Sequence, residues 1–379
     1  MIYLDNSATT KPNKSVLASF QQVSESFFAN PSSIHHIGGE AEKLLGSARE
    51  QVAHILDVEQ EEIVFTSGGT EGNNIAIKGI ALEHQNRGKH IITSVVEHAS
   101  VYEACKSLEK LGFEITYLTV NQNGIISMDE LKKSIREDTI LISLMHVNNE
   151  LGSIQPVKEI GELAKNYPKL FFHVDDVQGI GKVPLTLADS GIDLCTFSGH
   201  KIHGLKGTGI LYINKRTTLF PLFHGGSQER DIRSGTENLA GAVAISRALR
   251  LIKTSELTEL THLKSLDQYL RTHLEKMKYV LVNTPEDSAP HIMNISVPGL
   301  KPEVIIHILD QQDIFISTKS ACSSKRSDES RVLTACGYEQ ARSTSALRIS
   351  MTYSNTIDEL SIFLKALEKA IKQFRKVLE

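Results

Sequence analysis

The sequence has no block of like charge longer than a few residues and no apolar run near the length of a membrane helix. Its 379 residues include 41 lysines and arginines against 45 aspartates and glutamates, so neither nucleic acid nor a membrane is indicated as the main partner. A membrane helix needs about 20 consecutive apolar residues. The first residues contain no basic stretch followed by a long apolar core, so we predict no secretion signal and a cytoplasmic location.

Cysteine is also scarce. The four cysteines lie far apart and without C-x-x-C spacing: Cys105, Cys195, Cys322 and Cys336. This spacing argues against a structural zinc site and against a disulfide framework. We expect Cys105, Cys195 and Cys336 to be buried, inert thiols.

Short apolar runs alternate with helical patterns between about residues 60 and 215. The expected strands cover about 63–65, 91–93, 113–120, 140–145 and 171–174. This alternation predicts an α/β fold with a mostly parallel sheet and helices on both faces. Ligands of such sheets bind beyond the carboxyl ends of the strands. The polar residues that fall there are Thr70, His98, Asn149, Asp175 and Ser198.

The second part of the chain has fewer strands. We predict two helices at about 236–253 and 256–277, strands at 292–297, 314–317 and 347–351, and a last amphipathic helix from about 356. No proline- or glycine-rich linker marks a boundary. We expect a large domain at 14–256 and a smaller α+β domain at 257–379, with residues 1–13 packing on the smaller one.

Two strand ends carry the residues that pyridoxal 5'-phosphate (PLP) requires. Asp175 follows one apolar run, and Lys201, within Ser198-Gly199-His200-Lys201, follows the next. A lysine can hold the cofactor aldehyde as a Schiff base, and a carboxylate can pair with the pyridinium nitrogen. Taken singly, each would be an ordinary loop, cap or turn residue.

Two further junctions between a strand and a helix suit the same cofactor. Ser67-Gly68-Gly69-Thr70 is a glycine-rich turn whose following helix would offer free N–H groups to a phosphate. Plain turn chemistry is the alternative. His98 could stack on the cofactor ring and move protons, or it could simply cap a helix. His146-Val147-Asn148-Asn149-Glu150 could contact the ring oxygen or begin a loop.

Two residues of the second part suggest chemistry as well. Arg348 lies inside a strand-like run, where a charge is costly unless it is paired. Its partner could be a substrate carboxylate, held bidentately, or a structural acidic residue. Cys322 lies among small, polar and basic residues, where a thiol ionises and reacts more readily. Many loop cysteines nevertheless have no role.

Several segments occur in an order that resembles the cysteine desulfurases of the NifS/IscS type, which belong to the class V aminotransferase group of fold-type I PLP enzymes. The similar segments are 3–10, Asn30-Pro31-Ser32-Ser33 with His36, 66–71, 146–152, 173–175, Ser198-Gly199-His200-Lys201, Arg233-Ser234-Gly235-Thr236 and Ser320-Ala321-Cys322. The resemblance runs over nearly the whole chain. It implies a mostly parallel central sheet in a large domain plus a smaller α+β domain.

The resemblance also implies roles for individual residues. Lys201 would carry PLP, Asp175 would hold its ring nitrogen, and His98 would stack on the ring. Arg348 and Asn149 would bind the substrate, and Cys322 would accept the sulfur. The remaining implied cofactor contacts are Asn149 and Gln178 at the ring oxygen, Gly69, Thr70, Ser198 and His200 at the phosphate, and Thr236 of the neighbouring subunit of a homodimer.

The reaction implied is removal of sulfur from L-cysteine, giving L-alanine and a persulfide on Cys322. The sulfur would pass to an acceptor protein, which could be an iron–sulfur scaffold, a tRNA-thiolation enzyme or a protein of thiamine synthesis. Four residues depart from the usual family pattern, namely Asp176, Val177, Leu205 and Lys319. An aminotransferase, a selenocysteine lyase or a catalytically weak sulfur-relay partner of the same fold are the alternatives.

Overall fold

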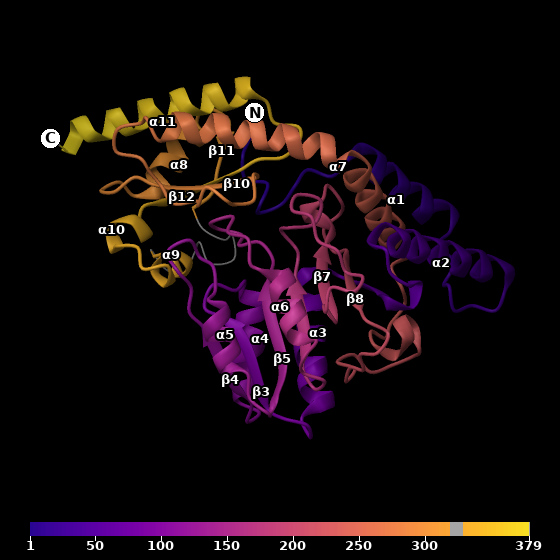
Figure 1. Cartoon of the computed structure of the whole chain (residues 1–379). Coiled ribbons are helices and arrows are strands. Elements are labelled where there is room, and N and C mark those ends of the chain that lie inside the picture. Colours follow the sequence, from indigo (N-terminus) through magenta and orange to yellow (C-terminus); the bar gives the residue numbers. More distant parts are fainter. Residues whose placement is uncertain (319–328, 379) are drawn as a thin grey trace.

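The computed structural model describes residues 1–318 and 329–378 (Figure 1). Its largest sheet has seven strands in the order β2-β8-β7-β6-β5-β3-β4. They are β2 (Ile63–Thr66), β3 (His90–Ser94), β4 (Glu114–Leu118), β5 (Thr139–Met145), β6 (Phe171–Asp175), β7 (Leu194–Ser198) and β8 (Gly209–Ile213). The pairs from β7 to β4 are parallel, and β8 runs antiparallel to both of its neighbours. The prediction of a mostly parallel α/β sheet is confirmed.

Helices cover both faces of this sheet. They are α1 (Lys14–Ser26), α2 (His36–Leu56), α3 (Gly69–His84), α4 (Ala99–Glu109), α5 (Met128–Ser134) and α6 (Val157–Ala164). On one face, Ile80 of α3 and Leu108 of α4 pack with Ile91 and Leu141 of the sheet. The other face is covered by a second cluster that includes Val52 and Ile160. Except for the edge strand β4, the strands are buried on both faces, which explains why they appear in the sequence as mainly apolar runs.

One long helix, α7 (Leu239–Leu274), connects the two lobes, and the prediction of two separate helices here is wrong. Its first half packs against α1 and α2, and its second half lies beside the C-terminal helix (Figure 1). The polar side chains between the two predicted helices are satisfied within α7. Lys253 pairs with Glu256 at 2.7 Å, and the Thr254 hydroxyl donates to the Arg250 oxygen. Neither glycine nor proline interrupts residues 242–274.

The smaller lobe contains the antiparallel sheet β12-β10-β9 and the parallel pair β1-β11. Its elements are β1 (Ile2–Tyr3), β9 (Leu281–Val282), β10 (Ile292–Ser296), α8 (Pro302–Asp310), β11 (Ile314–Phe315), α9 (Arg331–Ala335), α10 (Gln340–Ser343), β12 (Ala346–Ser350) and α11 (Ile357–Leu378). Ile2 and Leu4 belong to the core of this lobe together with Leu263 and Leu270 of α7. Division of the chain at residues 256 and 257 into folding units stays a prediction.

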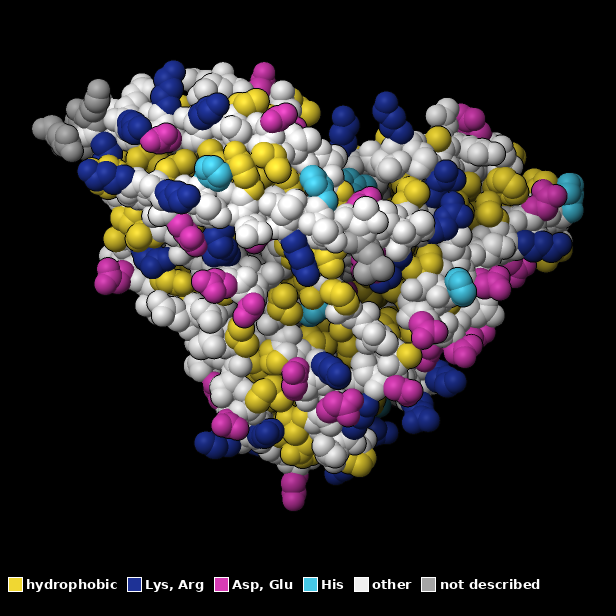
Figure 2. All heavy atoms as spheres, turned by 45° about the horizontal axis from the view of Figure 1, so that its top comes forward, with side chains coloured by type: hydrophobic (Ala, Val, Ile, Leu, Met, Phe, Trp, Pro, Cys, Tyr) yellow, Lys and Arg dark blue, Asp and Glu magenta, His cyan; other side chains and the backbone are white. Residues whose placement is uncertain are grey.

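The outer surface carries charges of both signs. Figure 2 shows basic and acidic side chains interspersed over one face, with neither sign gathered in a single region. Over residues 1–318 and 329–378, no helix combines the length and the apolar character needed to cross a bilayer.

Candidate active site

Lys201 lies in the short helix η2 (Gly199–Lys201), directly after β7. Its Nζ donates to the backbone oxygen of Ala8 at 2.9 Å and to that of Ser7. Its own backbone oxygen accepts from Nζ of Lys182 at 3.0 Å. The lysine is therefore held at both its amine and its carbonyl, by segments far apart in the sequence.

A cavity of about 750 Å³, part of it open to solvent, surrounds this amine. It brings together most of the residues that the sequence selected, namely Gly69, Thr70, His98, Asn149, Asp175, Gln178, Ser198, His200, Lys201 and Arg348. Most of them follow the carboxyl ends of β2, β3, β5, β6 and β7. The prediction that these strand ends form one site is confirmed in position; the role of each residue stays a prediction.

Asp175 is the last residue of β6 and is only 5% exposed. Its Oδ1 accepts from the backbone N–H of Val177 at 3.1 Å, and its Oδ2 accepts from Nδ2 of Asn73 at 2.8 Å. These two donors fix the orientation of the carboxylate at the base of the site.

Asp176 points away from this cavity, although it is the next residue. It is fully buried, and its Oδ1 lies 2.6 Å from Nδ1 of His146. Burial raises the pKa of this carboxyl, and the nearby His146 opposes that shift. Of the other departures from the family pattern, Val177 lines the cavity, Leu205 packs against the core of the large lobe, and Lys319 lies outside the described residues.

The glycine-rich turn begins α3 beside Ser198. Gly68 has a φ of 149°, and a Cβ on Gly69 would lie 2.8 Å from Cγ2 of Val177. Thr70 is exposed in the first turn, next to a shallow hollow that Ser198, His200 and Lys206 also line. The Ser198 hydroxyl is buried and has no hydrogen-bond partner among the described residues. Free helix N–H groups, hydroxyls and a lysine together suit an anion such as phosphate.

His98 is the N-cap residue of α4, so the capping alternative is correct as far as local structure goes. Its Nδ1 lies 2.8 Å from the Ser100 hydroxyl and 3.2 Å from the Ser100 backbone nitrogen. Burial lowers the pKa of this imidazole, and the charge of Asp175 opposes that shift. His98 therefore both caps α4 and lines the cavity.

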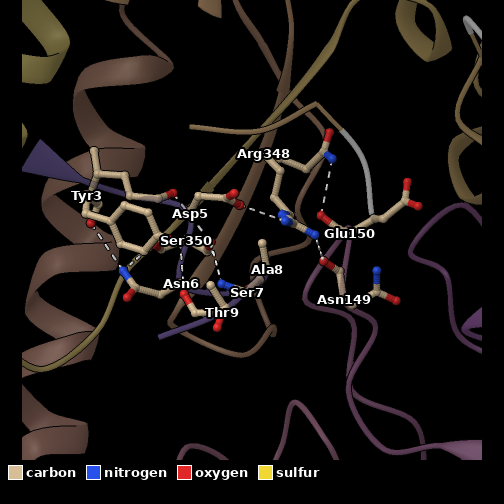
Figure 3. Close-up of polar contacts among 12 residues, drawn as sticks. Tyr3, Asp5, Asn6, Ser7, Ala8, Thr9, Asn149, Glu150, Arg348 and Ser350 are labelled. Atoms are coloured by element: carbon tan, nitrogen blue, oxygen red, sulfur yellow. Dashed lines mark hydrogen bonds and ion pairs between the residues drawn. The ribbon is translucent and has the colours of Figure 1, made fainter. Parts of the chain in front are cut away.

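Arg348 is 1% exposed and forms the structural ion pair that the sequence left open. Its Nη2 donates to Oδ1 of Asp5 at 2.9 Å, and its Nη1 donates to the backbone oxygen of Asn149 at 3.0 Å (Figure 3). The guanidinium also lines the cavity. Substrate binding by Arg348 stays a prediction.

The N-terminal segment forms one wall of the site, which the sequence patterns did not indicate. Ser7 and Ala8 line the cavity, and the Ser7 oxygen also accepts from Nε2 of Gln178 at 3.0 Å. Ser350 of β12 fixes this segment, because its hydroxyl accepts from the Ser7 N–H and its carbonyl accepts from Nδ2 of Asn6 (Figure 3). The two lobes thus meet at the Lys201 amine.

One described residue is not brought to the cavity, and another predicted residue is not among those the structure describes. Thr236 is exposed and absent from its lining, so its contribution from a neighbouring subunit stays a prediction. Cys322 lies outside the described residues. Cys105, Cys195 and Cys336 are buried, as expected. Burial raises the pKa of Cys105 and of Cys336 to about 12 and that of Cys195 well above the usual value.

Residues 2–363 match the family described as aminotransferase class V. The chain belongs to the class V aminotransferase family. It is 44% identical to a NifS/IcsS protein homolog of Lactobacillus delbrueckii subsp. bulgaricus, over 100% of this chain and 99% of the relative. It is 42% identical to cysteine desulfurase IscS of Dictyoglomus turgidum, over 99% of this chain and 96% of that relative. A solved NifS-like protein superposes with a TM-score of 0.93 at 36% identity, covering 98% of this chain and 99% of that one.

Class V aminotransferases generally use PLP, and the residues of this chain fit it. The Ser198 hydroxyl, which has no partner in residues 1–318 and 329–378, and the α3 N-terminus suit the phosphate, and Asp175 offers a carboxylate for a protonated ring nitrogen. The Lys201 amine lies in the same cavity. These three chemical requirements meet at one place.

Proposed function

We propose that the chain is a PLP-dependent cysteine desulfurase, which converts L-cysteine to L-alanine and passes the sulfur through Cys322 to an acceptor protein. One observation carries the proposal: the Lys201 amine, the Asp175 carboxylate and the His98 imidazole line a single cavity at the strand ends. Relatives named cysteine desulfurase match the chain over almost its full length, which supports the same activity.

The cofactor would be held by residues of five strand ends. Lys201 would carry it covalently, Asp175 would face the ring nitrogen, and His98 would cover the ring. The other contacts would be Asn149 and Gln178 at the ring oxygen and Gly69, Thr70, Ser198 and His200 at the phosphate. Bound PLP supplies an electron sink that stabilises negative charge at the substrate Cα.

Three side chains of the chain would act on the substrate. Arg348, already fixed by Asp5, would bind the α-carboxylate of L-cysteine. The Lys201 amine would move the Cα proton once substrate has replaced it. His98, whose lowered pKa keeps the imidazole neutral near pH 7, would form a hydrogen bond with the substrate through the ring nitrogen that faces the cavity.

Cys322 would act as the nucleophile. Its thiolate attacks the substrate sulfur, so that an S–S bond forms and the Cβ–S bond breaks. The electron pair of the Cβ–S bond stays with the carbon and is protonated to give the methyl group of alanine. No external oxidant or reductant is needed. This step rests on the sequence resemblance, because Cys322 lies outside the described residues.

The proposal includes partners. The chain would act as a homodimer in which Thr236 completes the phosphate site of the neighbouring subunit. The acceptor would be an iron–sulfur scaffold, a tRNA-thiolation enzyme or a protein of thiamine synthesis.

The test is product analysis with purified protein, L-cysteine and a reducing thiol. The wild-type protein should release equal amounts of alanine and sulfide. Lys201→Ala should abolish both products and the visible absorption of the holoenzyme, whereas Lys165→Ala, on the surface, should change neither. Cys322→Ala should abolish sulfide release. Full sulfide release by Cys322→Ala would refute the desulfurase mechanism, and transfer of the amino group to a keto acid instead would indicate an aminotransferase.

A further inference from the structure

A chain of hydrogen bonds connects Asp175 to His98 through two residues to which the proposed function gives no role. Nδ2 of Asn73 lies 2.8 Å from Oδ2 of Asp175 and 2.8 Å from the Ser100 hydroxyl. The Ser100 hydroxyl in turn lies 2.8 Å from Nδ1 of His98. Asn73 and Ser100 are both buried, and all four residues line the cavity.

The direction of every bond in this chain is fixed by chemistry. An ionised carboxylate can only accept, so it selects the amide orientation of Asn73 in which Nδ2 faces Asp175. The same Nδ2 donates to the Ser100 hydroxyl, which keeps its own proton; this proton goes to Nδ1 of His98 because Nδ1 carries a lone pair, as its second donor requires. The amide Oδ1 of Asn73 has no partner within the described part of the chain, so nothing there favours the flipped orientation.

A second donor acts on the same ring nitrogen. The backbone N–H of Ser100 points to Nδ1 of His98 at 3.2 Å, and a backbone N–H has no acceptor form. Nδ1 must therefore carry a lone pair, and in the neutral ring the proton lies on Nε2. Nε2 has no hydrogen-bond partner among the described residues and is the nitrogen left for a ligand in the cavity.

We propose that Asn73 and Ser100 are positioning residues, which relay the orientation set by the Asp175 carboxylate to His98 and hold its imidazole as the neutral Nε2–H tautomer. The inference rests on the proposed function, in which the same imidazole faces the substrate. In this tautomer Nε2–H is the group that His98 presents to the cavity, where it can donate a hydrogen bond. The charged groups around the ring are Asp175 and Glu150, which favour its protonation, and Lys201 and Arg331, which oppose it.

Two measurements test the relay. The first is the pH dependence of kcat/KM for alanine formation. Loss of the hydroxyl that donates to Nδ1 removes a hydrogen bond that only the neutral ring can accept, so the pKa of His98 should rise. Ser100→Ala should therefore move the acid limb of the pH profile upward by about 0.5 to 1 pH unit. Ser100→Thr keeps a hydroxyl and should restore the wild-type limb. Ser143→Ala is the matched control, because its buried hydroxyl bonds His173 outside the cavity, and it should cause no shift.

The second measurement is nitrogen NMR of protein labelled with ring-¹⁵N histidine, in which His98→Gln identifies the His98 signals. The wild type without cofactor should give the Nε2–H pattern at neutral pH, and Ser100→Ala should give a mixture of tautomers or a higher pKa. Asn73→Ala should act in the same direction. The double variant should shift no further than the larger single variant, because residues in series are not additive.

The outcomes separate the two proposals. If the wild type makes no alanine from L-cysteine, the proposed function fails, and the NMR experiment still decides the relay. If the wild type is active but Ser100→Ala changes neither the acid limb nor the His98 signals, the relay is overturned. An Nδ1–H pattern in the wild type, or additive shifts in the double variant, would overturn it as well.

Discussion

Asp175 and Asp176 are adjacent buried aspartates with opposite orientations, and replacing each with asparagine should separate cofactor binding from folding. Asp175 lines the cavity, whereas Oδ1 of Asp176 lies 2.6 Å from His146 outside it. Asparagine has nearly the same shape as aspartate, so each change removes charge with little change in packing.

The magnitudes follow from these contacts. A hydrogen bond to a charged group contributes about 1.5 to 3 kcal/mol, so Asp175→Asn should weaken PLP binding by about 10- to 150-fold. Asp176→Asn keeps a donor toward His146 and removes a buried carboxylate whose pKa is already raised. It should change the free energy of unfolding by at most about 1 to 3 kcal/mol and leave the cofactor Kd within about twofold.

Both quantities are measurable on the same two proteins. The cofactor Kd comes from titration of the apoprotein with PLP followed by absorption, and the stability of the apoprotein comes from urea unfolding. If Asp176→Asn weakened PLP binding as much as Asp175→Asn, the assignment of Asp175 as the ring partner would be wrong.

Three further predictions concern stability and reactivity. Arg49 and the buried Glu229 form a two-point ion pair at 2.7 and 2.8 Å, so Arg49→Ala should cost about 3 to 5 kcal/mol in urea unfolding; the exposed pair Lys106–Glu109 is the control, and Lys106→Ala should cost under about 1 kcal/mol. Burial raises the pKa of Asp193 to about 6, so the folded state binds the carboxyl proton of Asp193 more tightly than the unfolded state does. The stability that this group contributes is therefore lost as the pH rises from about 4 through 6. Asp193→Asn should flatten stability across that range, and an unchanged pH profile would contradict the assignment. With their pKa values near 12, Cys105 and Cys336 should resist iodoacetamide at pH 8 until the protein unfolds, as peptide mass spectrometry would detect; labelling of either in the folded protein would contradict their burial.

Much of the site could be predicted because parallel strands end at one edge of the sheet. Polar residues after successive apolar runs, such as His98, Asp175 and Lys201, therefore had to lie near one another. The pattern also predicted the smaller lobe and its last helix. These features depend on local periodicity and on one topological rule.

The remaining features depend on contacts between distant segments. Ser7 and Ala8 reach Lys201 only because β1 pairs with β11 and Ser350 holds the following residues. Asn73 and Ser100 looked like ordinary helix residues, and their importance comes from facing each other across two helices. The predicted break between 253 and 256 does not occur, because the hydroxyls of Thr254 and Ser255 bond to backbone oxygens within α7.

The attachment point of the cofactor tests the central claim most directly. Borohydride reduction of the holoenzyme, followed by peptide mapping, fixes the cofactor on the lysine that carries it. Lys182 is the natural competitor, because its amine lies 3.0 Å from the Lys201 oxygen and burial lowers its pKa to about 8. We predict a single pyridoxyl group on Lys201. Modification of Lys182 or another lysine, with Lys201 unmodified, would contradict the account.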